Sequence, residues 1–238
     1  MRTVRRPGKV VFGIAIASSL IAAACTSEPS SGAPDDQSSM TPATTSSASS
    51  PPLVQEGGAP LGPGTYTTVF QPKITFTTDA SWVSYADTTD FVSFERPGGG
   101  GGIAFKRIDK VLDPTRVHGL PVSTDYVGWI VSLPGVKVLA GPKTVTVDGV
   151  AATVIDVTAT TDAPTVYCKD PCVALWPLGR HADFQGQVAA LNPDFATRIV
   201  VIRLHGETVE LSACCAAGAD FESLAKDFDT MLRSVRFG

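Results

Sequence analysis

The chain has 238 residues, of which 19 are Lys or Arg and 23 are Asp or Glu. Residues 1–24 hold four basic residues and no acid, so removing them leaves 15 basic against 23 acidic residues. A net negative charge without a long Lys or Arg cluster excludes nucleic acid as a partner, and it excludes binding of the folded part to anionic membranes.

Residues 1–24 are typical of an export signal. Basic residues come first, and the segment from Val10 to Ala24 is apolar and ends in three alanines. About 20 residues are needed for a helix to cross a bilayer, so this segment is too short for a permanent span. Arg5 and Arg6 also resemble a twin-arginine signal, although Pro7-Gly8 stands where that signal has apolar residues.

The stretch "LIAAAC" ends at Cys25 and resembles the lipobox of bacterial lipoproteins, although Ala22 stands where the family prefers a larger aliphatic residue. The resemblance implies that Cys25 takes a diacylglycerol on its sulfur and becomes the mature N-terminus. We therefore expect a lipoprotein anchored in the cell membrane through Cys25, on its extracytoplasmic face. A plain signal peptide with an unmodified cysteine is the alternative.

The segment that follows, 25–60, is expected to be a disordered tether. After Cys25 it is dominated by Ser, Thr, Pro, Ala and Gly and has no Lys or Arg. Such a composition buries too little apolar surface to offset the entropy of ordering. Its Ser/Thr/Pro bias is equally compatible with an O-glycosylated stalk.

Residues 61–238 are long enough for one globular domain. Thr65–Thr78, interrupted by Pro72, predicts two strand pieces, and 91–108 predicts two strands joined at Gly98–Gly102. A phosphate-binding loop would need Gly-Lys-Ser/Thr and a helix after the glycines, but Ile103-Ala104-Phe105 favours a strand. The five glycines are therefore interpreted as a hairpin loop.

A short helix is expected after Ser123 or Thr124, either of which can cap it, and it ends at Pro134-Gly135. Two hairpins follow, one turning at Asp148-Gly149 and one at His205-Gly206. The chain closes with an amphipathic helix capped by Asp220 and a short terminal strand. This order predicts an α+β fold with a largely antiparallel β-sheet flanked by helices.

The succession of Trp82, a central "DYVGWIVSLPGV" helix, a Thr/Val hairpin, a strand pair and a helix ending in "MLRSVRF" resembles the LpqN-type lipoproteins of the actinobacterial cell envelope. The resemblance spans 65–237 and implies their Mog1/PsbP-like α/β/α sandwich. It also implies a non-catalytic binding protein, and it supplies no catalytic residue to carry over.

The four remaining cysteines are expected to be outside the cytoplasm, where disulfides persist. "CKDPC" favours a Cys168–Cys172 bridge, because Asp170-Pro171 is prone to turn. Strand alternation puts Cys214 and Cys215 on opposite faces, which predicts no bond between them while the strand is regular and makes Cys215 a buried thiol. Bonds between the loop and the strand are the alternative.

Three hypotheses for the function remain. We favour a non-catalytic module that binds an envelope protein or glycan, with a packed core and an exposed patch. The first alternative is a carrier of an apolar envelope ligand, which needs an apolar cavity of several hundred Å³. The second is a thiol-redox or hydrolytic enzyme, although Glu210 beside Cys214 would raise a thiol pKa. We expect no catalytic residue, metal or cofactor. "DYVGWI" with Asp125, and the group Arg180, His181 and Asp183, are candidates to line a pocket, but their spacing does not require one, so a solvated loop is the favoured interpretation.

Overall fold

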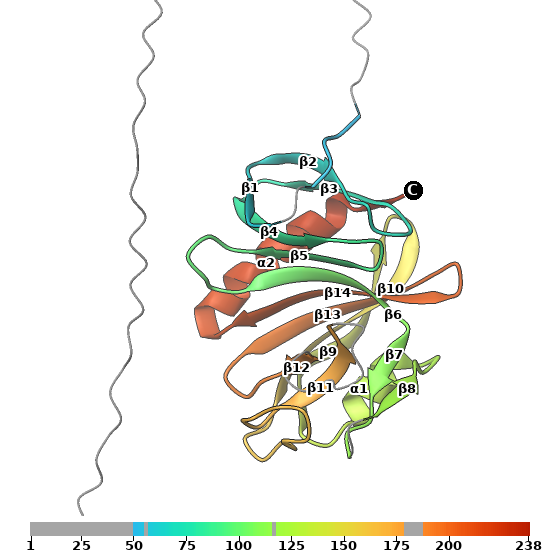
Figure 1. Cartoon of the computed structure of the whole chain (residues 1–238), viewed down its shortest axis with the longest axis vertical. Helices are drawn as coiled ribbons and strands as arrows, with labels where there is room; N and C mark the ends of the chain where they lie inside the picture. Colours follow the sequence, from blue (N-terminus) through green and yellow to red (C-terminus); the bar gives the residue numbers. More distant parts are fainter. Residues whose placement is uncertain (1–49, 55–56, 116–117, 179–187) are drawn as a thin grey trace, which may run out of the picture. The chain divides into compact units, whose positions relative to one another are not determined.

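The structure is a computed structural model that describes residues 50–54, 57–115, 118–178 and 188–238 (Figure 1). The expected signal peptide 1–24, Cys25 and most of the tether lie outside these residues. In the part of the chain that is described, no helix is long and apolar enough to cross a membrane.

An eight-stranded antiparallel sheet dominates the fold, and strands from both ends of the domain pair within it. In spatial order it consists of β1 (Ala59–Leu61), β4 (Trp82–Asp87), β5 (Phe91–Glu95), β6 (Gly102–Ile108), β14 (Glu207–Ala216), β13 (Ala196–Leu204), β10 (Val150–Ala159) and β9 (Val136–Val147). The pairing of β6 with β14 brings together residues about a hundred positions apart in sequence.

Three small sheets and two helices complete the described part. The small sheets are β2 (Gly64–Thr67) with β3 (Ile74–Thr78) and β15 (Arg236–Phe237), β7 (Lys110–Leu112) with β8 (Gly119–Pro121), and β11 (Val173–Pro177) with β12 (Val188–Leu191). The helices are α1 (Tyr126–Ser132) and α2 (Gly218–Ser234). The fold is therefore a sheet-rich α+β fold, as the element order predicted at that level.

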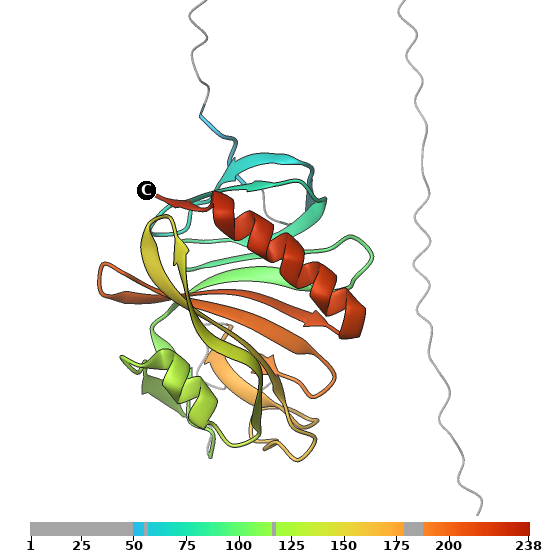
Figure 2. The same cartoon turned by 180° about the vertical axis from the view of Figure 1, so that it is seen from behind.

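Both faces of the large sheet are covered, because alternate side chains of its central strands enter two different clusters. Val200 of β13 packs with Leu224 and Phe228 of α2, which runs across one face (Figure 2). Ile199, the preceding residue, packs with Tyr126 and other residues of α1 and β11. Because successive side chains of a strand point to opposite faces of the sheet, a continuous apolar run contributes to a separate hydrophobic cluster on each face.

Both predicted hairpin turns are confirmed. Asp148 and Gly149 have φ of 49° and 76°, and His205 and Gly206 have φ of 51° and 87°. These positive values are those a tight type I′ turn requires of its two central residues.

The two predicted helix starts are wrong in detail. Asp125, rather than Ser123 or Thr124, caps α1, since its carboxylate accepts from the backbone N–H of Gly128 at 2.8 Å. The N-cap of α2 is Ala217, which has no side-chain acceptor, and Asp220 lies inside the first turn. There its negative charge still favours the positive end of the helix dipole.

The C-terminal end of the expected tether packs against the domain. Val54 is 6% exposed, and Leu53 forms a bridge with Thr67. Residues 59–61 form β1 and pair with β4, and the backbone N–H of Gly58 donates to the backbone carbonyl oxygen of Ser84 at 2.7 Å. The expected boundary at 60 is therefore too late, because the apolar pair Leu53-Val54 already has partners in the fold.

Candidate functional site

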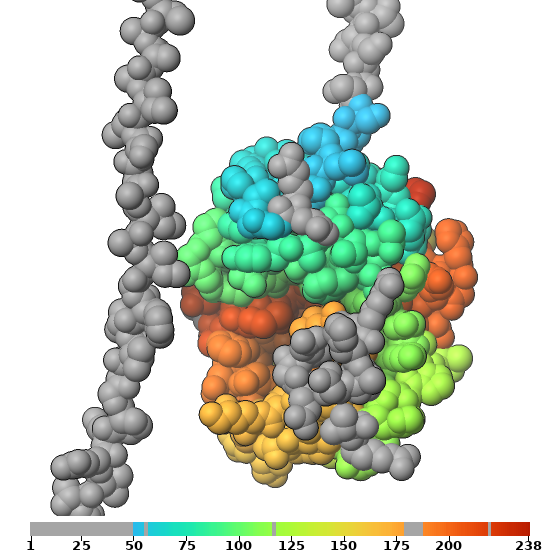
Figure 3. Space-filling view, viewed as in Figure 1, coloured from blue at the N-terminus to red at the C-terminus, as the bar shows by residue number. Residues whose placement is uncertain are grey.

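A cleft of about 680 Å³ lies on the face of the large sheet opposite α2. Its floor comes from β5, β6 and β14, one wall from β11 and β12, and the other from the glycine loop between β5 and β6. In Figure 3 the red to orange surface of the C-terminal strands lies directly below the green surface of the β5–β6 region. This volume falls in the range of small-molecule sites.

Apolar side chains make up most of the walls, and a row of three small residues, two of them serines, crosses the floor. The larger apolar side chains that line it are Phe91, Leu175, Trp176, Leu178, Val188 and Leu191. On the floor, Ser93, Ala104 and Ser212 stand side by side on three neighbouring strands. The cleft is thus suited to an apolar body with a polar group directed at β14.

Glu210 is the chemical centre of this floor. It is 2% exposed, and its Oε2 accepts from the hydroxyl of Tyr126 at 2.8 Å and from the indole N–H of Trp176 at 3.2 Å. Burial raises the pKa of Glu210, while hydrogen bonds from Tyr126, Trp176 and Ser212 oppose that shift. Burial and the neighbouring Glu210 raise the pKa of Tyr126 well above its ordinary value, so Tyr126 remains a donor.

A charged group lies beside the cleft but is already paired. Lys106, the strand partner of Glu210, donates to Asp90 at 2.6 Å. Its ammonium group also lies 5.9 Å from the ring centre of Phe91 and 6.0 Å from that of Trp176. Lys106 therefore helps to fix the two aromatic rings that line the cleft.

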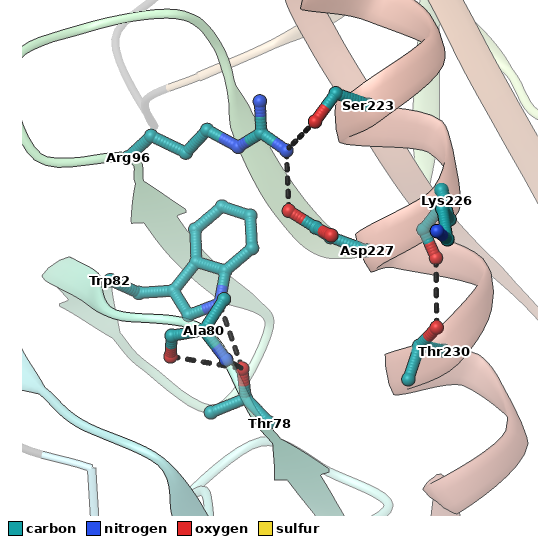
Figure 4. Close-up of polar contacts among 8 residues, drawn as sticks. All are labelled: Thr78, Ala80, Trp82, Arg96, Ser223, Lys226, Asp227 and Thr230. Atoms are coloured by element: carbon teal, nitrogen blue, oxygen red, sulfur yellow. Dashed lines mark hydrogen bonds and ion pairs between the residues drawn. The ribbon is translucent and has the colours of Figure 1, made fainter.

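The glycine-rich wall is a hairpin loop, as expected, and it is anchored to α2. Arg96 at its base pairs with Asp227 and donates to Ser223 at 3.2 Å (Figure 4). Gly101 has φ of 99°, and a Cβ there would lie 2.6 Å from the carbonyl oxygen of Cys214. Only glycine lets this loop pass so close to β14.

The cysteines form two disulfides in the structure. Cys168 is joined to Cys172, the pairing the sequence favoured, with their Cα atoms 6.1 Å apart. Cys214 is joined to its neighbour Cys215, and both line the cleft. The prediction of a buried Cys215 thiol is wrong, because the strand is irregular there: Cys215 has φ of 73°, is exposed, and stands beside a register shift between β13 and β14.

The other candidate residues do not gather at the cleft. Two histidines, which were not predicted to be ligands, are exposed: His118 in a loop and His205 in a turn. Asp125 serves as the cap of α1, while Trp129 stacks on Tyr126 with ring centres 5.6 Å apart. The trio at 180–183 and Cys25 lie outside the described residues. Within the described residues, no group of three His, Cys, Asp or Glu side chains could hold a metal ion.

Sequence reasoning identified Glu210 only as a neighbour of Cys214 and did not find Trp176. A signal for the latter existed, since "CVALWP" is a short apolar run between a cysteine and a proline, which is typical of a buried strand. That strand is β11, whose residues form the wall opposite the glycine loop.

A second, smaller cleft of about 350 Å³ lies between β9, β10, β13 and α2. Arg198 in it holds Asp156 with two hydrogen bonds of 2.8 Å and Asp229 with one of 2.7 Å. These charges already satisfy one another, so the larger cleft is the better candidate for a ligand.

Comparisons with known protein families and with curated proteins find no match to this chain. Among solved structures there is a match to LpqN, a protein of Mycobacterium tuberculosis involved in cell envelope biogenesis, at 14% identity and a TM-score of 0.28. The match covers 78% of this chain and 88% of that one. At these values the two chains are only distantly similar.

Proposed function

We propose that this chain is a lipid-anchored, non-catalytic binding protein on the extracytoplasmic face of the cell membrane, and that its large cleft carries an apolar or amphipathic small molecule. The observation that carries the proposal is the cleft of about 680 Å³ with its apolar walls. A carrier needs a cavity of this kind, whereas a module that binds only through its surface does not. The carrier reading therefore replaces surface binding of a protein or glycan as the leading hypothesis.

The location rests on the sequence. A basic start, a short apolar segment and Cys25 at the end of "LIAAAC" support export and lipidation. A Cys25→Ala variant is expected to leave the membrane fraction, and the protein with Cys25 is expected to carry a diacyl adduct. Continued fractionation of the variant with membranes would contradict anchoring through that residue. The finer Mog1/PsbP-like α/β/α assignment belongs to this proposal and rests on the order of elements.

The absence of catalysis is also part of the proposal. The four cysteines of the domain are bonded in pairs, so none of them supplies a thiolate nucleophile for hydrolytic chemistry in this state. This supports binding over a cysteine-dependent hydrolase.

The cleft can be tested with a neutral naphthylamine dye that fluoresces in apolar surroundings. Ala104 lies on the floor and is partly exposed, so Ala104→Phe should fill the cleft and weaken dye binding by about tenfold or more, the loss of a buried apolar contact. Ala151→Phe is the matched control, because Ala151 is exposed on β10 of the same sheet and lines neither cleft. Equal dye binding by the two variants would refute the site.

A further inference from the structure

The head group of the ligand can be argued from the acceptor capacity of Glu210. A carboxylate has about four acceptor positions on its two oxygens. Tyr126 and Trp176 both donate to Oε2, and Ser212 supplies a third hydrogen bond to the carboxyl group. About one position is left, on a side chain that lines the cleft.

The indole N–H of Trp176 can only donate, and the Tyr126 hydroxyl donates here as well. Both lone-pair positions of Oε2 are therefore used, which leaves Oε1 as the oxygen with spare capacity. A ligand group that donates a hydrogen bond fits this oxygen, whereas a group that only accepts meets no donor from Glu210 while it is ionised.

The charges around the cleft point the same way. Its described lining includes two carboxylates, Glu95 and Glu210, and no Lys, Arg or His. Lys106 is the nearest cation on the floor strands, but Asp90 holds it at 2.6 Å. An anionic head on the floor would meet like charge without a compensating cation from the described lining, and like charges in a site of low dielectric repel strongly.

We infer that the cleft selects amphiphiles whose head donates a hydrogen bond and carries no negative charge, an alkyl amine above an alkyl alcohol, and rejects alkyl carboxylates. The inference rests on the proposed function, since it names the class of ligand for that cleft. The apolar walls hold the alkyl chain, and Oε1 of Glu210 receives the ammonium or hydroxyl proton.

The experiment compares dodecylamine, dodecanol and dodecanoate below their micellar concentrations, by displacement of the naphthylamine dye from the mature chain, residues 25–238. Dodecylamine should bind at least about tenfold more tightly than dodecanoate, the usual gain of a charge-assisted hydrogen bond. Dodecanoate binding as tightly as the amine would overturn the inference. This ranking is measured on the unmodified sequence, so it does not depend on the folding of any variant.

Two variants distinguish a direct contact between the ligand head and Glu210 from the overall negative charge of the cleft. Glu210→Gln should lower the affinity for dodecylamine by about tenfold and change that for dodecanol much less, since an amide oxygen still accepts. Glu95→Gln, at an exposed position of the same lining, is the control and should have a small effect. If Glu95→Gln costs as much as Glu210→Gln, the contact with Glu210 is refuted.

Failure of the inference and failure of the proposed function give different results. Dye binding with no preference among the three heads overturns the assignment of Glu210 and leaves the carrier proposal standing. Absence of binding by the dye and by all three amphiphiles overturns both.

Discussion

Replacing Tyr126 with Phe tests whether the hydroxyl that joins α1 to the central strand β14 contributes to stability. Tyr126 is 1% exposed, and its ring stacks on Trp129, so the substitution keeps the packed ring and deletes one oxygen. Glu210 then loses one of its two donors at Oε2 and keeps the Trp176 indole at 3.2 Å.

The loss of folding stability expected for Tyr126→Phe depends on whether Glu210 is ionised. A hydrogen bond to an ionised group contributes about 1.5–3 kcal/mol, and a bond between neutral groups about 0.5–1.5 kcal/mol. Tyr126→Phe should therefore lower the free energy of unfolding by about 1–3 kcal/mol. In a domain of this size each kcal/mol corresponds to about 2–4 °C in Tm.

Urea unfolding followed by tryptophan fluorescence measures the difference. Tyr85→Phe is the control, because Tyr85 is 52% exposed, and it should change stability by less than about 0.5 kcal/mol. If Tyr126→Phe is as stable as Tyr85→Phe, the hydrogen bond to Glu210 does not stabilise the fold, and the account of α1 anchoring is refuted.

Four further outcomes are expected. Burial raises the pKa of Glu210 above its ordinary 4.5. The stability of the wild type relative to Glu210→Gln should therefore be greatest below pH 4.5 and fall as the pH rises through the pKa of Glu210 in the folded state. A stability difference in urea unfolding that does not change with pH would contradict this prediction. Phe228→Ala should cost about 3–5 kcal/mol in the same assay, since Phe228 is fully buried between α2, to which it belongs, and the large sheet, and a loss below 1 kcal/mol would mean that the surrounding side chains collapse into the cavity. Deletion of 26–49 should leave Tm unchanged, whereas deletion of 26–60 also removes the buried Val54 and β1 and should cost about 2 kcal/mol by calorimetry; equal Tm values would return the boundary to 60. Thiol counting on the unfolded, unreduced domain should find no free cysteine, and two would restore the expectation of unpaired thiols at the end of β14.

The sequence was sufficient for features that depend on neighbours in the chain. The turn at Asp148-Gly149 is decided by the conformations those two residues tolerate, and the helix at 126–132 by its apolar spacing and the Pro134-Gly135 stop. The glycine loop belongs here too, because Ile103-Ala104-Phe105 after it favours a strand.

Features set by distant partners could not be predicted. The order of strands in the large sheet depends on pairings such as β6 with β14, which no local pattern specifies. The same holds for Cys215, because alternation describes a regular strand and the register shift opposite Arg198 ends that regularity. The wall formed by β11 and β12 was not predicted for a related reason, because a short apolar run indicates a buried strand but not the sheet to which that strand belongs.

The polarity of the side chains in β14 differs between its two faces. A strand covered on both faces is normally apolar on both, as β13 is from Ile199 to Ile202. In β14 the residues toward α2 are Val209, Leu211 and Ala213, whereas Thr208, Glu210 and Ser212 on the other face are polar yet buried. A buried carboxylate costs free energy that a leucine would not, and Glu210 offsets part of that cost by accepting from Tyr126 and Trp176. Glu210 and Ser212 also line the cleft, and that is the physical argument for assigning Glu210 to a ligand in addition to its contacts with α1 and β11.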